Sequence, residues 1–330
     1  MMTDDLSALM HTTPGGLLLV LAVMVPFAGV LVGLLLGGRH VQRVAALTVF
    51  VGLAAAADIA VVLVQRGEPV VYLLGGWAPP LGIALRADGL SAAMMVAVAI
   101  VVLLVGLYAR ADFARPPGGE GRAPFLYWLL LMAVWGSLNL VFVSGDLFTL
   151  YVALELLTFS AVPLVCLDGK GETLRAALRY LLFALAGSLL YLLGAVLIYG
   201  AYGTLDMLLL ADQAGPEPVT WAALALMTVG LLAKTALFPL HLWLPPAHAG
   251  APAAASAVLS ALVVKGSWFL VVRLWFDALP GVVTLSAAQL LGGLGAAAIV
   301  FGSVVALRQE RLKLLVAYST VAQIGYLFIL

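Results

Sequence analysis

Three ionisable residues stand inside long apolar segments of this 330-residue sequence, and their types are those that carry protons: Glu155, Lys234 and Lys265. A charge at the centre of a bilayer costs about 2.5–3.5 kcal/mol, and a lysine at mid-depth is too far from the headgroups to reach them. Each of these side chains therefore needs a charged partner, water or a change of protonation state.

Two interpretations of this set compete. In the first, Glu155 and one lysine form an ion pair that only fixes helix packing. Two lysines and one glutamate cannot neutralise one another completely, however, so one amine must bind water or release its proton. Burial disfavours a charged amine and a nearby carboxylate favours it, so a change at the carboxylate can load or unload the amine. The numbers and types of residue therefore favour a proton relay.

Polar neighbours on the same helix face as Glu155 leave two interpretations open. Tyr151 and Thr158 lie at i−4 and i+3 from the glutamate, so all three share one face of a helix. They either hold water beside the carboxylate or make ordinary hydrogen bonds between helices.

The segment that carries Lys234 predicts a broken helix. Residues 219–250 would form a straight helix about 48 Å long, which exceeds a bilayer core of about 30 Å. Pro239 removes a backbone hydrogen bond and clashes with the preceding turn, and freed backbone at this depth is tolerated where it lines a cavity or is buried in protein. Lys234 is expected near the end of the first half-helix, where carbonyl groups stabilise a cation.

Two histidines follow Lys234 at seven-residue intervals, which is nearly one face of an unbroken helix. Histidine passes protons near neutral pH. His241 is either a relay or a structural hydrogen-bonding residue. His248, expected near the cytoplasmic end, is interpreted as a capping or loop residue, with a relay role as the alternative.

Composition then indicates the elements that position these residues. Hydrophobic residues make up 64% of the chain and charged residues 10%, whereas soluble domains are roughly a quarter charged. The fold class is therefore an all-α polytopic membrane protein with about ten transmembrane helices. The predicted spans are 16–37, 43–64, 89–109, 124–143, 147–167, 173–200, 219–250 (broken), 253–275, 284–307 and 314–330. Residues 68–88, rich in Gly, Pro and aromatics, are expected as an extended or hairpin segment at the membrane interface.

Positive charge predicts the orientation. Most of the 16 lysines and arginines fall in alternate loops: Arg39, Arg43, Arg110, Arg115, Arg122, Lys170, Arg175, Arg179, Arg308, Arg311 and Lys313. By the positive-inside rule this side is cytoplasmic and the N-terminus is outside. The zero net charge gives no reason to expect nucleic acid as a partner. One cysteine cannot ligate an iron–sulfur cluster, and no dinucleotide or phosphate-binding motif is found, so no cofactor, metal or catalytic redox site is predicted.

Three motifs in order resemble a known family. LFTLYVALELLTFSAVPLV, AKTALFPLHLWLPPAHAGAPAAASAVLSALVVKG and RLKLLVAYSTVAQIGY are similar to the antiporter-like membrane subunits. These comprise the pumping subunits of complex I, the large subunits of Mrp-type cation/proton antiporters and relatives in membrane-bound hydrogenases. The resemblance runs from about residue 70 to the end, and VYLLGGWAPPLGIALRADGLSA and FPLHLWLPPAH favour the Mrp D-subunit and hydrogenase branch.

The resemblance implies roles and domains. Glu155, Lys234 and Lys265 match the family's proton-transfer residues, and Lys313 resembles the basic residue that opens its AYS helix, although lysines at such positions are mostly surface anchors. It implies N-terminal helices in 1–123, a complete five-helix repeat in 124–275 and the start of an inverted repeat in 276–330. Because that second repeat is incomplete and the chain stops within an apolar run, the sequence is expected to be C-terminally truncated.

The function expected is a proton-conducting subunit of a multisubunit membrane complex, most like an Mrp-type antiporter subunit. A subunit of complex I (NADH:quinone oxidoreductase) or of a membrane-bound hydrogenase is the alternative. The expected partners are other membrane subunits, protons, sodium as a second candidate ion and the lipid bilayer. The expected location is the bacterial inner membrane.

Overall fold

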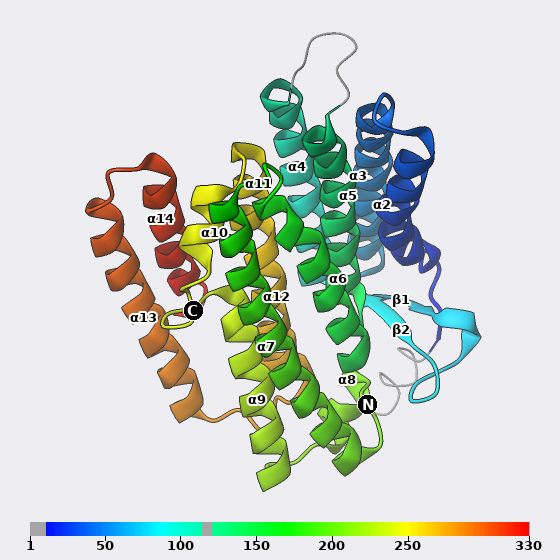
Figure 1. The fold of residues 1–330 in the computed structure, drawn as a ribbon. Helices are drawn as coiled ribbons and strands as arrows, with labels where there is room; N and C mark the ends of the chain where they lie inside the picture. Colours follow the sequence, from blue (N-terminus) through cyan, green and yellow to red (C-terminus); the bar gives the residue numbers. More distant parts are fainter. Residues whose placement is uncertain (1–10, 114–120, 330) are drawn as a thin grey trace. The chain divides into compact units, whose positions relative to one another are not determined.

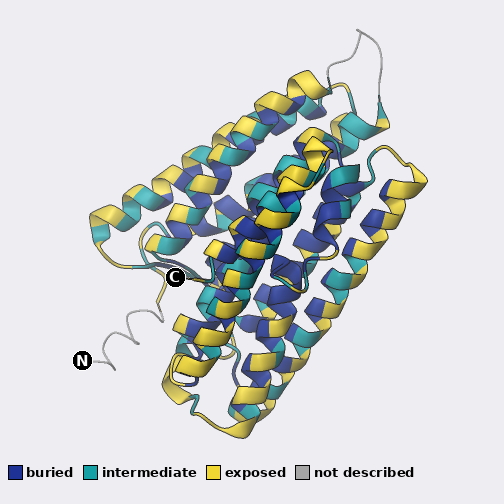
Figure 2. Ribbon diagram, turned by 90° about the vertical axis from the view of Figure 1, so that its left-hand side faces the viewer, coloured by how far each residue is buried: buried dark blue, intermediate teal, exposed yellow. Residues whose placement is uncertain are grey.

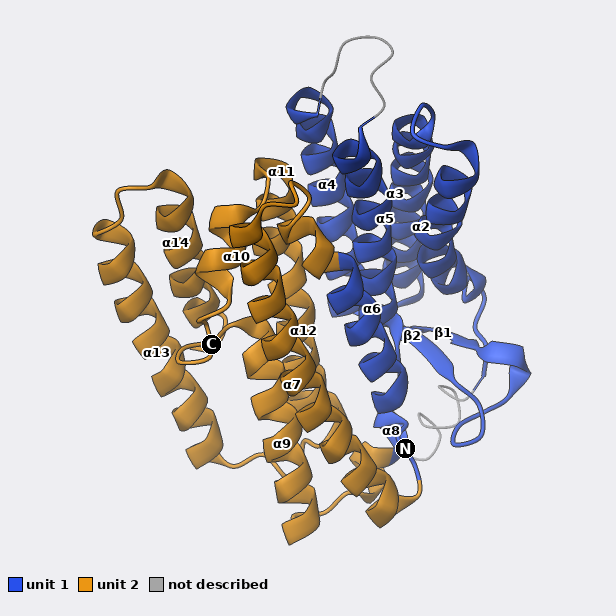
Figure 3. Cartoon of the chain, viewed as in Figure 1, with its two compact units in different colours: residues 1–160, 204–209 blue, residues 161–203, 210–330 orange. Residues whose placement is uncertain are grey.

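The computed structural model describes residues 11–113 and 121–329, so Arg115 of the predicted cytoplasmic charges lies outside the described residues. The chain divides into two compact units (Figure 3). Unit 1 comprises residues 1–160 and 204–209, and unit 2 comprises residues 161–203 and 210–330.

Unit 1 is a helical bundle with one short hairpin (Figure 1). Its elements are α2 (Leu17–Leu36), α3 (Val41–Arg66), β1 (Val70–Leu73), η1 (Leu74–Gly76), β2 (Ala84–Ala87), α4 (Gly89–Asp112), α5 (Arg122–Val143) and most of α6 (Leu147–Val165). Helix α5 packs against α2, α3 and α4. It buries large side chains such as Tyr127, Trp135 and Phe142 almost completely, and these residues form the core of the unit.

The segment between α3 and α4 adopts one of the two predicted conformations, an antiparallel hairpin. Its register pairs Val70 with Ala87 and Leu73 with Ala84. Gly75 and Gly76 have φ angles of 67° and 77°, which glycine adopts readily because it has no Cβ. The chain reverses there, and the position of the hairpin at a membrane interface remains a prediction.

Unit 2 contains the remaining helices. They are α7 (Gly171–Tyr202), α8 (Met207–Gln213, whose first residues belong to unit 1), α9 (Pro218–Thr235), α10 (Leu244–Gly250), α11 (Ala253–Val258), the π-helical turn η2 (Leu259–Val263), α12 (Val264–Val272), the π-helical turn η3 (Arg273–Ala278), α13 (Leu285–Leu307) and α14 (Leu312–Tyr326). Helices α7 and α9 cross closely: a Cβ added at Gly187 would stand 2.6 Å from the carbonyl oxygen of Gly230. Such small-residue contacts are typical of helix packing in membranes.

The outer faces of the helices are apolar. Leu35, Val64 and Leu307 are 85%, 85% and 86% exposed, and Figure 2 shows exposed residues along the helices. Exposure of apolar side chains to water is unfavourable, whereas their exposure to lipid tails is not, because the tails are equally apolar. The fold is therefore that of an integral membrane protein.

Nine helices in the described residues are long and apolar enough to cross a bilayer, and they match nine of the ten predicted spans. The tenth predicted span, 314–330, contains α14, a helix of 15 residues, which is shorter than the roughly 20 that a bilayer core requires. The predicted broken helix is confirmed: α9 ends at Thr235 and α10 begins at Leu244. The predicted repeat boundaries at 124–275 and 276–330 remain a prediction.

Candidate functional site

The break after α9 places Lys234 in the last helical turn. The next residue but one, Ala236, has φ 60° and ψ 37°, a left-handed conformation that ends the helix. The predicted break at Pro239 is confirmed, because the link between α9 and α10 contains this proline and α9 ends four residues before it. The reason is that Pro239 has no N–H for the carbonyl of Thr235 and its ring would clash with that carbonyl in a continuous helix.

Lys234 is buried at this helix end, with 7% of its surface exposed. Its side-chain stem lies against Gly187 of α7, since a Cβ at that glycine would stand 3.3 Å from the lysine Cγ. The indole Nε1 of Trp243 donates a hydrogen bond of 2.9 Å to the carbonyl of Ala233. Lys234 is therefore part of the C-terminal turn of a half-helix, the end at which a positive charge is stabilised.

The link between α9 and α10 presents His241 among aromatic rings. The imidazole is 3% exposed and lies 5.5 Å from the ring of Phe238 and 4.9 Å from the ring of Phe301. Its Nδ1 is buried, and no hydrogen-bond partner for it is found in the part of the chain that the structure describes. A buried polar atom of this kind normally bonds water, which keeps both interpretations of His241 open.

His248 lies inside α10, not in a loop, and is 0% exposed. Its Nδ1 is 2.8 Å from the Oγ of Ser256. Within residues 11–113 and 121–329 its Nε2 has no hydrogen-bond partner. The loop interpretation is therefore wrong, because the second half-helix extends past this position and buries the ring. A capping role remains a prediction, since His248 lies in the last turn of α10.

Lys265 follows the π-helical turn η2 and is half-buried. Its Nζ donates a hydrogen bond of 2.6 Å to the carbonyl oxygen of Ser260. The hydroxyl of the same serine is 2.8 Å from the hydroxyl of Thr320 on α14. Wide turns of this kind often occur at functional sites.

Lys313 is the second residue of α14, and it is exposed. Its Nζ donates a hydrogen bond of 2.7 Å to the carbonyl of Ala251, the C-cap of α10. A cation at a helix C-terminus is stabilising, so this contact joins the start of α14 to the end of α10.

Glu155, Tyr151 and Thr158 belong to unit 1, whereas the lysines and histidines above belong to unit 2. Glu155 and Tyr151 are half-buried on α6, and Thr158 is buried with its hydroxyl donating to the carbonyl of Leu154 at 2.8 Å. Within unit 2 the structure brings His248 to Ser256 and Lys265 to Ser260. A pairing of Glu155 with either lysine remains a prediction.

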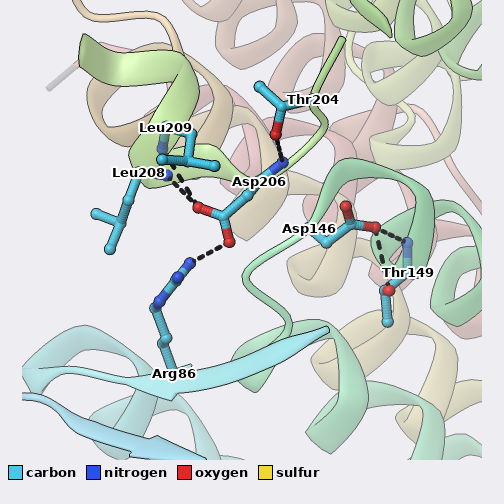
Figure 4. A network of polar contacts seen from close by, with 7 residues as sticks. All are labelled: Arg86, Asp146, Thr149, Thr204, Asp206, Leu208 and Leu209. Atoms are coloured by element: carbon cyan, nitrogen blue, oxygen red, sulfur yellow. Dashed lines mark hydrogen bonds and ion pairs between the residues drawn. The ribbon is translucent and has the colours of Figure 1, made fainter. Parts of the chain in front are cut away.

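A buried ion pair in unit 1, between Arg86 and Asp206, was not predicted from the sequence (Figure 4). Nη1 of Arg86 on β2 lies 2.7 Å from Oδ2 of Asp206, and the side chains are 12% and 4% exposed. Oδ1 of Asp206 also accepts hydrogen bonds from the backbone N–H groups of Leu208 and Leu209 at the start of α8. The one available signal was an arginine within the predicted hairpin.

Backbone hydrogen bonds also join the segment that carries Asp206 to the start of α6. The N–H of Leu147 donates to the carbonyl of Leu205, and the N–H of Met207 donates to the carbonyl of Gly145, each at 2.9 Å. Asp146 caps α6 through the N–H and hydroxyl of Thr149 (Figure 4). The start of α6 and the segment 204–209 are therefore held together as one structure.

Known proteins show similarity along most of the chain. The chain is 37% identical over 316 residues to NADH-quinone oxidoreductase subunit N of Desulforudis audaxviator, covering 93% of this chain and 62% of that protein. It is 32% identical over 320 residues to the D subunit of the Na(+)/H(+) antiporter of Alkalihalophilus pseudofirmus, covering 94% and 62%. A chain in the structure of a membrane-bound sulfane sulfur reductase, an archaeal respiratory complex, superposes with a TM-score of 0.85 at 29% identity, covering 96% of this chain and 64% of that one.

The chain thus spans 62% of the length of both curated relatives. Residues 144–330 match the family described as NADH:quinone oxidoreductase/Mrp antiporter, TM. This range contains Glu155, Lys234, Lys265 and the break between α9 and α10. The chain therefore belongs to the NADH:quinone oxidoreductase/Mrp antiporter transmembrane family.

Proposed function

We propose that this chain is a proton-conducting subunit of a multisubunit membrane complex, most similar in function to the D subunit of an Mrp-type cation/proton antiporter. The observation that carries the proposal is Lys234, an amine 7% exposed in the last turn of a broken membrane helix. Placing a lysine at membrane depth costs free energy, so an ionisable residue at such a site is by default a candidate functional residue. Broken helices at ion sites are a recurring feature of transporters.

Each residue has a role in this proposal. Lys234 loads and releases the proton, and Glu155 modulates the charge of the amine, because a carboxylate nearby favours the protonated form and burial disfavours it. Lys265 passes the proton laterally, with His241 assisting. His248, Lys313, Tyr151 and Thr158 line or support the route, and no group in this chain is assigned redox chemistry.

A subunit of complex I is the second candidate, favoured by the 37% identity to a NADH-quinone oxidoreductase subunit N; a membrane-bound hydrogenase is a third setting. In either case electron transfer would belong to partner chains. Purification of the native complex separates these candidates: copurifying subunits with NADH oxidation or hydrogenase activity would replace the antiporter assignment. Sodium-dependent proton movement without a redox activity would support it.

We further propose a bacterial inner-membrane location with the N-terminus outside, supported by the distribution of arginines and lysines between alternate loops. A protease site fused before Met1 would be cut by protease added to right-side-out spheroplasts. Cleavage only in inverted vesicles would show that the N-terminus is on the cytoplasmic side.

The function is tested by Lys234→Ala in the complete complex, assayed as pH-gradient formation or dissipation in inverted membrane vesicles. We expect loss of coupled proton movement with normal assembly. The matched control is Lys170→Ala, because Lys170 is 77% exposed in a surface ion pair with Asp168. Wild-type transport by the Lys234→Ala complex would refute the assignment.

A further inference from the structure

A row of hydroxyl groups lies along one helix of unit 2, outside the roles assigned above. Ser256 and Ser260 are four residues apart on the run from α11 into η2, so they lie on neighbouring turns of one face. The Oγ of Ser256 is 2.8 Å from Nδ1 of the buried His248, and the Oγ of Ser260 is 2.8 Å from the Oγ1 of Thr320 on α14.

Lys265 contacts this row at Ser260. The π-helical turn Leu259–Val263 precedes it, and its Nζ reaches back to the Ser260 carbonyl at 2.6 Å. Ser260 therefore contacts Lys265 through its carbonyl and Thr320 through its hydroxyl. For a proton on Nζ to reach the Ser260 hydroxyl, the lysine side chain must rotate away from the carbonyl, or one water must bridge the two groups.

The hydroxyl pair has the chemistry of a two-way link. Thr320 Oγ1 also bonds the carbonyl of Val316 at 2.9 Å, and either hydroxyl of the pair can be the donor. A hydroxyl carries one proton and two lone pairs, so it accepts a proton on one side while it releases its own on the other. Neither residue has to hold a net charge between transfers.

We propose that the Ser260–Thr320 pair is the step by which a proton leaves Lys265 toward α14; this inference rests on the proposed function. An N–H bond of Lys265 breaks as a new O–H bond forms on Ser260. The original Ser260 proton moves to Thr320, and the original Thr320 proton passes to water. The lysine ends neutral, both hydroxyls end neutral, and the positive charge ends on hydronium.

Thr320→Val tests the step because it keeps the shape of threonine and removes its hydroxyl. In vesicles containing the complete complex, we expect proton movement to slow by about 100-fold or more. Thr320→Ser keeps the hydroxyl and is expected to retain the wild-type rate. Ser260→Ala is the independent second variant. The double variant is expected to be no slower than either single variant, because the two substitutions interrupt the same proton-transfer step.

Thr228→Val is the matched control. Thr228 is also a buried threonine whose hydroxyl bonds another element, accepting from Trp275 Nε1 at 2.9 Å. A structural role for the Ser260–Thr320 pair would make Thr320→Val and Thr228→Val equally mild, or would make Thr320→Ser as slow as Thr320→Val, and either result overturns the inference. If Lys234→Ala abolishes transport and Thr320→Val does not, only this inference fails; if Lys234→Ala transports normally, the proposed function fails.

Discussion

Arg86 and Asp206 stand 120 positions apart in the sequence, yet Nη1 of the arginine lies 2.7 Å from Oδ2 of the aspartate. Both side chains are largely buried, and the aspartate also caps α8. The pair fixes the hairpin strand β2 to the segment 204–209 within unit 1 (Figure 4). The ion pair thus joins two segments whose contact cannot be predicted from the periodicity of apolar residues.

Asp206→Ala should destabilise the protein by about 3–5 kcal/mol, because removal of one partner leaves a buried charge without compensation. Thermal unfolding of the purified protein in detergent measures the effect. Lys170→Ala, which removes the 77% exposed partner of the surface pair with Asp168, should cost only about 0–1 kcal/mol. Replacing Arg86 and Asp206 together by Met and Leu should cost less than Asp206→Ala alone. Equal melting temperatures for Asp206→Ala and Lys170→Ala would show that the pair of Arg86 and Asp206 contributes nothing.

Gly187→Ala should destabilise unit 2 by about 1–3 kcal/mol, the usual cost of overpacking. The added Cβ would stand 2.6 Å from the backbone carbonyl of Gly230, which cannot move without separating α7 from α9. Gly200→Ala is the control on the same helix, since a Cβ there meets nothing within 4 Å. Alanine is the better helix former, so Gly200→Ala should be neutral or stabilising. A lower melting temperature for Gly200→Ala than for Gly187→Ala would contradict the close crossing.

Asp168 should contribute a pH-dependent stability in the loop between α6 and α7. The Thr173 hydroxyl, which bonds Oδ1 at 2.5 Å, and then the backbone and ammonium of Lys170 hold the pKa of this carboxyl below its usual value. The folded pKa is thus lower than the unfolded one of about 3.9. The contribution is therefore fully present well above the unfolded pKa and is lost progressively as the pH falls from there through the lowered folded pKa.

Thr173→Val removes the largest cause of this shift. The wild type should be more stable than the variant near neutral pH, and the part of the difference that arises from Asp168 should disappear on acidification. Melting temperatures measured between about pH 7 and about pH 3 check this. A stability difference that is constant across the series would mean that the hydroxyl acts only through packing.

The sequence predicts the helices of this fold well, because each membrane crossing needs about 20 apolar residues and few sequences satisfy that by chance. Nine predicted spans and the broken helix after Lys234 are found. The break covers residues 236–243 and contains Pro239, as predicted, but the residue at which α9 ends could not be predicted. Proline excludes a helix from continuing through it, but it does not determine which earlier residue takes the left-handed conformation, here Ala236.

Contacts between distant residues could not be predicted. Nothing in the local pattern connects Arg86 with Asp206 or Ser260 with Thr320, because each partner is ordinary within its own segment and only the fold brings the two together. The π-helical turn before Lys265 was also missed, since apolar periodicity does not distinguish it from an α-helical turn. Buried lysines were recognisable because a charge in an apolar run is costly wherever the chain places it.

The proposed function requires the amine of Lys234 to change its charge during transport, and Lys234→Arg is the substitution that tests this requirement. Arginine keeps a positive charge and a long stem but is not deprotonated in proteins. In proteoliposomes containing the complete complex, we expect normal assembly and loss of proton movement for Lys234→Arg, while Lys170→Arg at the exposed loop transports as the wild type does. Proton movement at the wild-type rate in the Lys234→Arg complex would show that transport does not depend on deprotonation of this residue.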